Sequence, residues 1–138
     1  MNRILLSFII FCFGSISLAQ NGNEWIDYSQ QYVGFKIYED GWYRLNYSDV
    51  QPAFSGVGID VSTISPDQFQ VFGREKEQPI VVQDGGDGSF DAGDYIEFYG
   101  KKNDGWKDSL LFDDPATEMA DAYYSFVNDT IVYFLSVS

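Results

Sequence analysis

The chain contains no histidine, and its only cysteine, Cys12, lies in an N-terminal apolar run. Ser–His–Asp and Cys–His nucleophilic sites both need an imidazole, so the sequence excludes them. Zinc sites built on histidine or cysteine are also excluded, because one cysteine and no histidine cannot supply the ligands. Paired carboxylates remain, but a general acid needs a buried carboxyl group, and the acidic residues here stand mostly in glycine-rich turns. We therefore expect no catalytic residues in this chain.

Basic residues are also scarce. The 138 residues include 8 Lys and Arg against 21 Asp and Glu, for a net charge of −13. Nucleic acid and anionic lipid surfaces are poor partners for such a field, so we expect neither. Cations or a basic protein surface are better partners. Solubility outside the cell is the plainer explanation of the charge.

No apolar run is long enough for a spanning helix, which needs roughly 20 residues. The longest run, residues 4–16, follows the basic start Asn2-Arg3 and leads to the small residues before a cleavage point after Ala19. We predict a signal peptide over residues 1–19 and a domain over residues 20–138, exported to the periplasm, outer membrane or cell surface. The domain would have no transmembrane helix. Cleavage also removes Cys12, so no disulfide would be available to stabilise the domain.

The rest of the sequence is typical of short β-strands. Residues 33–38 are expected to form a short strand that pairs in a hairpin, around residues 39–41, with a strand over 42–47. In the second strand Tyr43, Leu45 and Tyr47 alternate with Trp42, Arg44 and Asn46, which gives it one face toward the core. In this hairpin Gly41 would supply a positive φ. Ser48-Asp49 would then cap a short helical turn that runs through Phe54, although Pro52 limits its length.

Later segments continue this pattern. We expect a second hairpin between residues 69–72 and 79–82, then an acidic loop over residues 84–94, a strand over 95–99 and a final strand over 131–137. The predicted fold class is all-β, a β-sandwich or jelly-roll-like domain with short helical turns. A core strand that runs almost to the last residue favours a fragment of a longer protein.

The acidic loop offers a candidate metal site. It places four carboxylates among glycines, and Ca²⁺ takes six to eight oxygen ligands from such loops. The alternative is a tight, water-facing turn in which Asp and Gly serve backbone geometry. The spacing does not match the EF-hand, which favours the turn. The candidate calcium ligands are Asp84, Asp87, Asp91 and Asp94.

The three tryptophans, Trp25, Trp42 and Trp106, are a second candidate site. Exposed tryptophans can form a platform on which sugar rings stack. Aromatic residues that alternate along strands are, however, more often part of a core. The sequence leaves both interpretations open and favours the core.

Several short motifs resemble, in order and spacing, the N-terminal region of type IX secretion system sortases, which belong to the gingipain-type C25 peptidase family. The likeness extends from about Trp25 to Val137. It is clearest in the segment DGGDGSFDAGDYIEFYG, which begins at Asp84 and ends at Gly100. The other motifs are Gly41-Trp42-Tyr43-Arg44-Leu45, Ser65-Pro66-Asp67-Gln68-Phe69, Glu77-Gln78-Pro79-Ile80, Lys102-Asn103-Asp104-Gly105-Trp106, Leu110-Leu111-Phe112-Asp113-Asp114-Pro115 and Tyr124-Ser125-Phe126-Val127.

The resemblance implies a β-rich propeptide-like or docking domain that precedes a cysteine peptidase domain. In this family the parent protein processes the C-terminal sorting signals of secreted cargo at the surface of Bacteroidetes cells. Its catalytic cysteine and histidine lie in a later domain, so no position of this chain would carry them. The implied partners are the downstream peptidase domain of the same protein and other type IX secretion components. The alternative is a free-standing exported module that binds calcium or a glycan.

Overall fold

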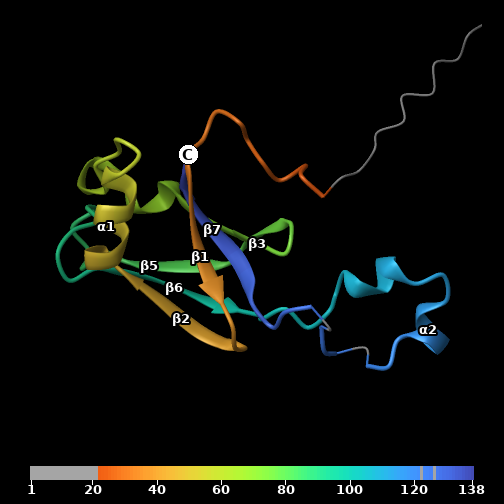
Figure 1. The fold of residues 1–138 in the computed structure, drawn as a ribbon. Helices are drawn as coiled ribbons and strands as arrows, with labels where there is room; N and C mark the ends of the chain where they lie inside the picture. Colours follow the sequence, from red (N-terminus) through yellow and green to blue (C-terminus); the bar gives the residue numbers. More distant parts are fainter. Residues whose placement is uncertain (1–21, 122, 126) are drawn as a thin grey trace, which may run out of the picture.

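The computed structural model describes residues 22–121, 123–125 and 127–138 (Figure 1). The predicted signal peptide, residues 1–19, lies outside this part of the chain. In the described part, no helix is long and apolar enough to cross a membrane. Its strands are β1 (Tyr32–Ile37), β2 (Gly41–Asn46), β3 (Phe69–Gly73), β4 (Lys76–Gln78), β5 (Ile80–Gln83), β6 (Tyr95–Gly100) and β7 (Ile131–Val137). Its helical elements are α1 (Tyr47–Ser55), α2 (Pro115–Glu118) and the 3₁₀ turns η1 (Val61–Thr63), η2 (Pro66–Gln68) and η3 (Asp108–Leu111).

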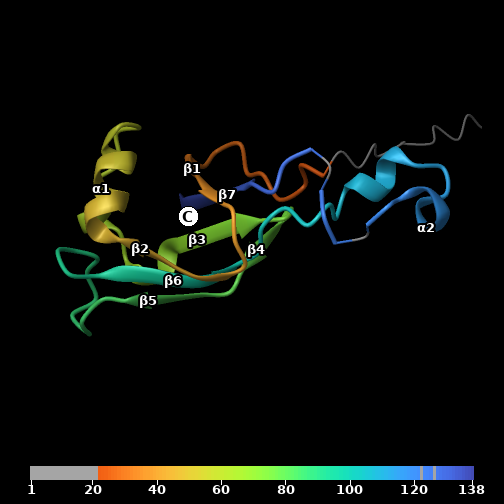
Figure 2. The same cartoon turned by 60° about the horizontal axis from the view of Figure 1, so that its bottom comes forward.

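The strands form two antiparallel sheets. The first has the order β1-β7-β3-β4 and the second the order β2-β6-β5. The two sheets cross each other, with α1 at one end, and the segment that carries α2 extends from the other end (Figures 1 and 2). The prediction of a β-rich fold with short helical turns is therefore confirmed.

The first predicted hairpin is wrong, although both of its strands exist. β1 pairs with β7 and β2 pairs with β6, so the chain passes from one sheet to the other between them. Gly41 begins β2 and is not among the residues with positive φ. The corner is held instead by Tyr43, whose hydroxyl donates to the Glu39 carbonyl at 2.9 Å and accepts from the Glu39 N–H at 3.3 Å. The alternation of side chains correctly predicts that one face of β2 is turned toward the core. It does not determine which strand pairs with β2.

The second predicted hairpin is wrong in its pairing as well. β3 turns back through Arg74 and Glu75 and pairs with β4, while β5 leaves this sheet and pairs with β6. The residue between β4 and β5 is Pro79, which has no N–H to donate to a ladder. Proline therefore marks the point where the chain changes sheets.

The helical turn predicted after β2 is confirmed, and it is longer than expected. α1 extends beyond Phe54 to Ser55 with Pro52 inside it, and its N-cap residue is Asn46 rather than Ser48. The first N–H of the helix, that of Tyr47, donates to the Asp94 carbonyl at 2.9 Å. This bond ties α1 to the end of the acidic loop.

The core lies between the two sheets and is centred on Tyr133 of β7. Its side chain is fully buried, and its ring lies 6.0 Å from that of Phe98 on β6. The Tyr133 hydroxyl accepts a hydrogen bond from the Lys101 N–H at 3.1 Å, just beyond β6. Both sheets and α1 contribute to this core, which includes Ile37, Phe54, Val71, Ile96 and Leu135.

A close contact between Gly73 and Tyr133 gives a stability prediction. A Cβ atom at Gly73 would lie 2.3 Å from the Tyr133 ring, so the Gly73→Ala variant must displace a fully buried aromatic side chain. We expect a loss of about 3 kcal/mol in the free energy of unfolding, measured by urea denaturation.

Gly41→Ala is the matched control, because a Cβ there meets nothing within 4 Å and Gly41 has no positive φ. We expect this variant to be neutral, or more stable by up to about 1 kcal/mol. Equal losses in the two variants would contradict the assigned contact.

Candidate functional site

The acidic loop directs its carboxylates onto its own backbone. Asp84 accepts hydrogen bonds from the N–H groups of Gly86 and Gly88 at 3.1 and 3.2 Å. In the same way the Asp87 carboxylate accepts from the Ser89 N–H at 2.9 Å, and Asp94 accepts from the Asp91 N–H at 2.6 Å. These are the local bonds of Asp-Gly turns. Gly85, Gly86 and Gly88 all have positive φ, which the turns require.

These carboxylates do not converge on one point. Within the described residues, no group of three or more Asp, Glu, His or Cys side chains is placed to hold a metal ion. The calcium site stays a prediction.

An aromatic residue anchors the loop to the core. Phe90 is fully buried, and its ring lies 4.6 Å from that of Phe69 and 5.8 Å from that of Tyr47. The loop is therefore a fixed turn at the end of the molecule that also carries α1 (Figure 1).

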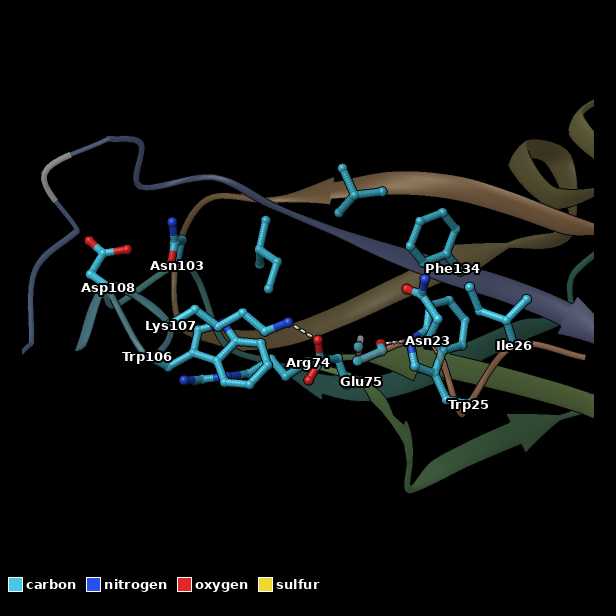
Figure 3. Close-up of a pocket in the computed structure, with 14 residues that line it drawn as sticks. Asn23, Trp25, Ile26, Arg74, Glu75, Asn103, Trp106, Lys107, Asp108 and Phe134 are labelled. Atoms are coloured by element: carbon cyan, nitrogen blue, oxygen red, sulfur yellow. Dashed lines mark hydrogen bonds and ion pairs between the residues drawn. The ribbon is translucent and has the colours of Figure 1, made fainter. Parts of the chain in front are cut away.

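A group of cavities at the opposite end has more varied chemistry. Trp106 lines three of them, with volumes of about 470, 570 and 390 Å³. Arg74 lines the first two. In the first cavity Trp25 and Phe134 stand on one side, and Trp106 and Lys107 on the other (Figure 3).

The turn between β3 and β4 projects two charged side chains into these cavities. Arg74 and Glu75 have φ values of 53° and 64°, in the left-handed region that usually takes glycine or asparagine in a two-residue hairpin. Side chains of this size are disfavoured there by about 1 to 2 kcal/mol each. Strain of this kind often occurs at functional sites, so the turn is part of the candidate site.

Ion pairs hold both side chains of the turn in place. Arg74 makes a two-pronged contact with Asp104, with N–O distances of 2.7 and 3.1 Å, and its side chain is largely buried. Glu75 pairs with Lys107. The Arg74 guanidinium and the Lys107 amine lie 5.1 and 5.0 Å from the centre of the Trp106 ring, within range of a cation–π interaction.

The three tryptophans do not form one platform. Trp25 packs on the outer side of the four-stranded sheet, with ring distances of 5.3 Å to both Phe72 and Phe134. It shares the 470 Å³ cavity with Trp106. Trp42 lies on the other sheet, 75% exposed and edge-on to Tyr99 at 5.8 Å.

The Trp42 face continues along its sheet as a cross-strand pair. Arg44 lies opposite Glu97 and its Nη2 atom is 2.7 Å from the carboxylate. This hydrogen bond raises the pKa of Arg44. The same guanidinium lies 3.8 Å from the centre of the Tyr95 ring, so the exposed face is a connected row of aromatic and charged groups.

Sequence reasoning missed the gathering of positive charge around Trp106. Of the seven basic residues after Arg3, five come from the two short segments 74–76 and 101–107, which the fold brings to one end of the molecule. The signal in the sequence was this clustering within an otherwise acidic chain. These five residues are Arg74, Lys76, Lys101, Lys102 and Lys107.

Comparison with known proteins gives no relative: no protein-family model, no curated protein and no solved structure matches the chain.

The hydrogen bonds of Asp84 give a prediction for the acidic loop. Asp84→Ala removes the acceptor for two backbone N–H groups, and we expect a loss of about 1 kcal/mol in unfolding free energy, measured by urea denaturation. Asp84→Asn keeps one acceptor oxygen and should lose less. Equal stability of wild type and Asp84→Ala would contradict the turn role.

The same variants test for calcium. If the loop binds Ca²⁺, the melting temperature of the wild type rises in millimolar Ca²⁺ relative to chelator, and Asp84→Ala abolishes the rise. An unchanged melting temperature in the wild type removes the calcium site.

The different surroundings of Trp25 and Trp42 give a second stability prediction. Trp25→Ala removes a ring packed between Phe72 and Phe134, and we expect a loss of about 2 kcal/mol. Trp42→Ala removes a mostly exposed ring and should change the unfolding free energy by about 0.5 kcal/mol or less. Urea denaturation followed by far-UV circular dichroism measures both, and the reverse order would show that the two roles are misassigned.

Proposed function

We propose that this chain is the non-catalytic N-terminal docking domain of a type IX secretion sortase-like C25 peptidase. The order and spacing of the motifs between Trp25 and Val137 support this family. The chain has no histidine, so a Cys–His peptidase centre must lie in another domain of the parent protein. The domain acts in the periplasm, in the outer membrane or on the cell surface, where its parent processes cargo.

The fold we propose for this domain is a β-sandwich. Side chains of the four-stranded sheet, such as Val71 and Leu135, share one core with Ile96 and Phe98 of the three-stranded sheet. Two sheets that bury their facing sides against each other are the basis of a sandwich. A rigid body of this kind suits a docking module.

The observation that carries the docking role is an apolar surface on a projecting segment. We call residues 108–128, of which 122 and 126 are not described, the arm; it contains η3 and α2 and extends away from the sheets (Figures 1 and 2). Leu110, Leu111, Tyr123 and Val127 of the arm are each 73–82% exposed. Single exposed apolar side chains are common on protein surfaces, and we take the four on this projecting segment as its docking surface.

The partner we propose for the arm is the peptidase domain of the same protein. A domain linked in the same chain is present at a high effective concentration, so a modest apolar contact is enough to hold it. Apolar anchors such as Leu110 and Leu111 would enter pockets of the peptidase domain. The sandwich beneath the arm would fix the direction of approach.

Binding of the separate domains tests this role. We expect the described domain to bind an isolated C25 peptidase domain of the parent protein in titration calorimetry, and Leu110→Ser with Leu111→Ser to weaken binding by about tenfold or more. Tyr28→Ser with Val57→Ser is the matched control, since both residues are exposed and lie outside the arm. An equal effect of the two double variants, or no binding by the wild type, would contradict the docking role.

The DNA after codon 138 is an independent check. A reading frame that continues into a domain with histidine and cysteine supports the proposal. A stop codon there, together with a stable purified chain, favours the alternative of a free-standing exported binding module. The observation in favour of that alternative is the 570 Å³ cavity beside Trp106, which has room for a small ligand.

A further inference from the structure

The 570 Å³ cavity has walls of two kinds. Tyr99 and Trp106 supply aromatic surface, and Arg74, Lys76 and Lys101 supply positive charge. The cavity lies between the β3–β4 hairpin and the segment that follows β6. We call it the cationic cavity.

The positive charge of this cavity is only partly neutralised. The Arg74 guanidinium is paired with Asp104, which is the one acidic residue among the described residues that line the cavity. Lys76 and Lys101 make no ion pair with any described residue. Two lysines without an ion-pair partner among the described residues therefore line one concave surface, in a chain whose acidic residues outnumber its basic residues by 13. Like charges held together repel, and an anion in the cavity relieves this repulsion.

Hydrogen bonds fix the backbone beside the cavity, at the positions from which the two lysine side chains extend. The Lys101 N–H donates to the buried Tyr133 hydroxyl, and the neighbouring Lys102 N–H donates to the Asp40 carboxylate at 2.9 Å. Lys76 is the first residue of β4 and pairs with Gly73. A preformed site loses less freedom on binding than a mobile one.

The position of β4 points to the class of ligand. β4 is one of the two edge strands of its sheet in the described part of the chain, so one side of its backbone has no strand partner. An extended peptide can hydrogen-bond to such an edge, while its side chains meet the residues beside it. A saccharide lacks the regularly spaced N–H and C=O groups that pair with a strand edge.

We propose that the cationic cavity binds an acidic segment of an extended polypeptide partner. Carboxylates of the segment contact Lys76 and Lys101, while its backbone lies along β4 and its aliphatic groups lie on Tyr99 and Trp106. No residue of the arm is among the described residues that line this cavity. The proposal therefore applies both to a docking domain and to a free-standing module.

The probe is a dye-labelled hexaglutamate peptide, and the measurement is fluorescence anisotropy with the unmodified chain. We expect saturable binding that Lys76→Gln with Lys101→Gln weakens by about tenfold. Lys36→Gln is the control, because Lys36 is an exposed lysine on β1 that does not line the cavity and makes no ion pair with a described residue. We expect this variant to bind within about twofold of the wild type. Both lysines of the double variant are exposed, and unchanged thermal melting would show that it is folded.

Three outcomes would overturn the proposal. The first is that hexaglutamine, which has the same length without the charge, binds as well as hexaglutamate. The second is that the double lysine variant binds hexaglutamate as well as the wild type does. The third is that oligogalacturonate or inorganic phosphate binds more tightly than hexaglutamate, which would assign the cavity to an anionic saccharide or to phosphate. Failure of the arm experiment would leave all of these results unaffected, so the two proposals are tested separately.

Discussion

The buried Tyr133 side chain is the contact on which the two sheets depend. Its ring packs against Gly73 within its own sheet and against Phe98 of the other sheet, and its hydroxyl accepts the Lys101 N–H. A tyrosine can do all three because it combines a large apolar ring with one polar atom at the tip. The same residue that closes the core therefore also fixes the start of the segment that carries Lys101, Lys102 and Lys107.

The acidic loop and the cluster of basic residues lie at opposite ends of the molecule, although two of those basic residues are paired with Glu75 and Asp104. The acidic loop lies between β5 and β6, beside α1, whereas the positive residues lie at the other ends of these strands, where β6 runs into the segment from Lys101 to Lys107 (Figures 1 and 2). Net charge alone describes the protein as acidic and says nothing of this arrangement.

Much of the secondary structure follows from local sequence, and the pairing of strands does not. The alternation in β2 correctly predicted a face with Tyr43 and Leu45 inside, because burial depends on side chains within the strand itself. Its partner β6 is far along the chain, and nothing in residues 42–47 specifies it. The β3–β4 turn escaped prediction for a different reason, since Arg74 and Glu75 are unusual in the left-handed region that this turn requires.

The candidate sites show the same limit. Asp-Gly spacing correctly indicated turns in the acidic loop, where hydrogen bonds span two to four residues. The cavities around Trp106 could not be predicted in this way, because Arg74 and Trp106 come from segments that only the folded chain brings together. The sequence alone does not distinguish Trp25 from Trp42. In the fold, Trp25 packs on Phe72, whereas Trp42 is mostly exposed.

The central position of β7 also dictates an order of folding. β7 lies between β1 and β3, yet at residues 131–137 it follows every other described strand in the sequence. β1 and β3 both pair with β7 and not with each other, so the four-stranded sheet cannot form before β7 has been synthesised. Pairing across such a long sequence separation is slow. The larger sheet is therefore completed only when residues 131–137 reach both β1 and β3.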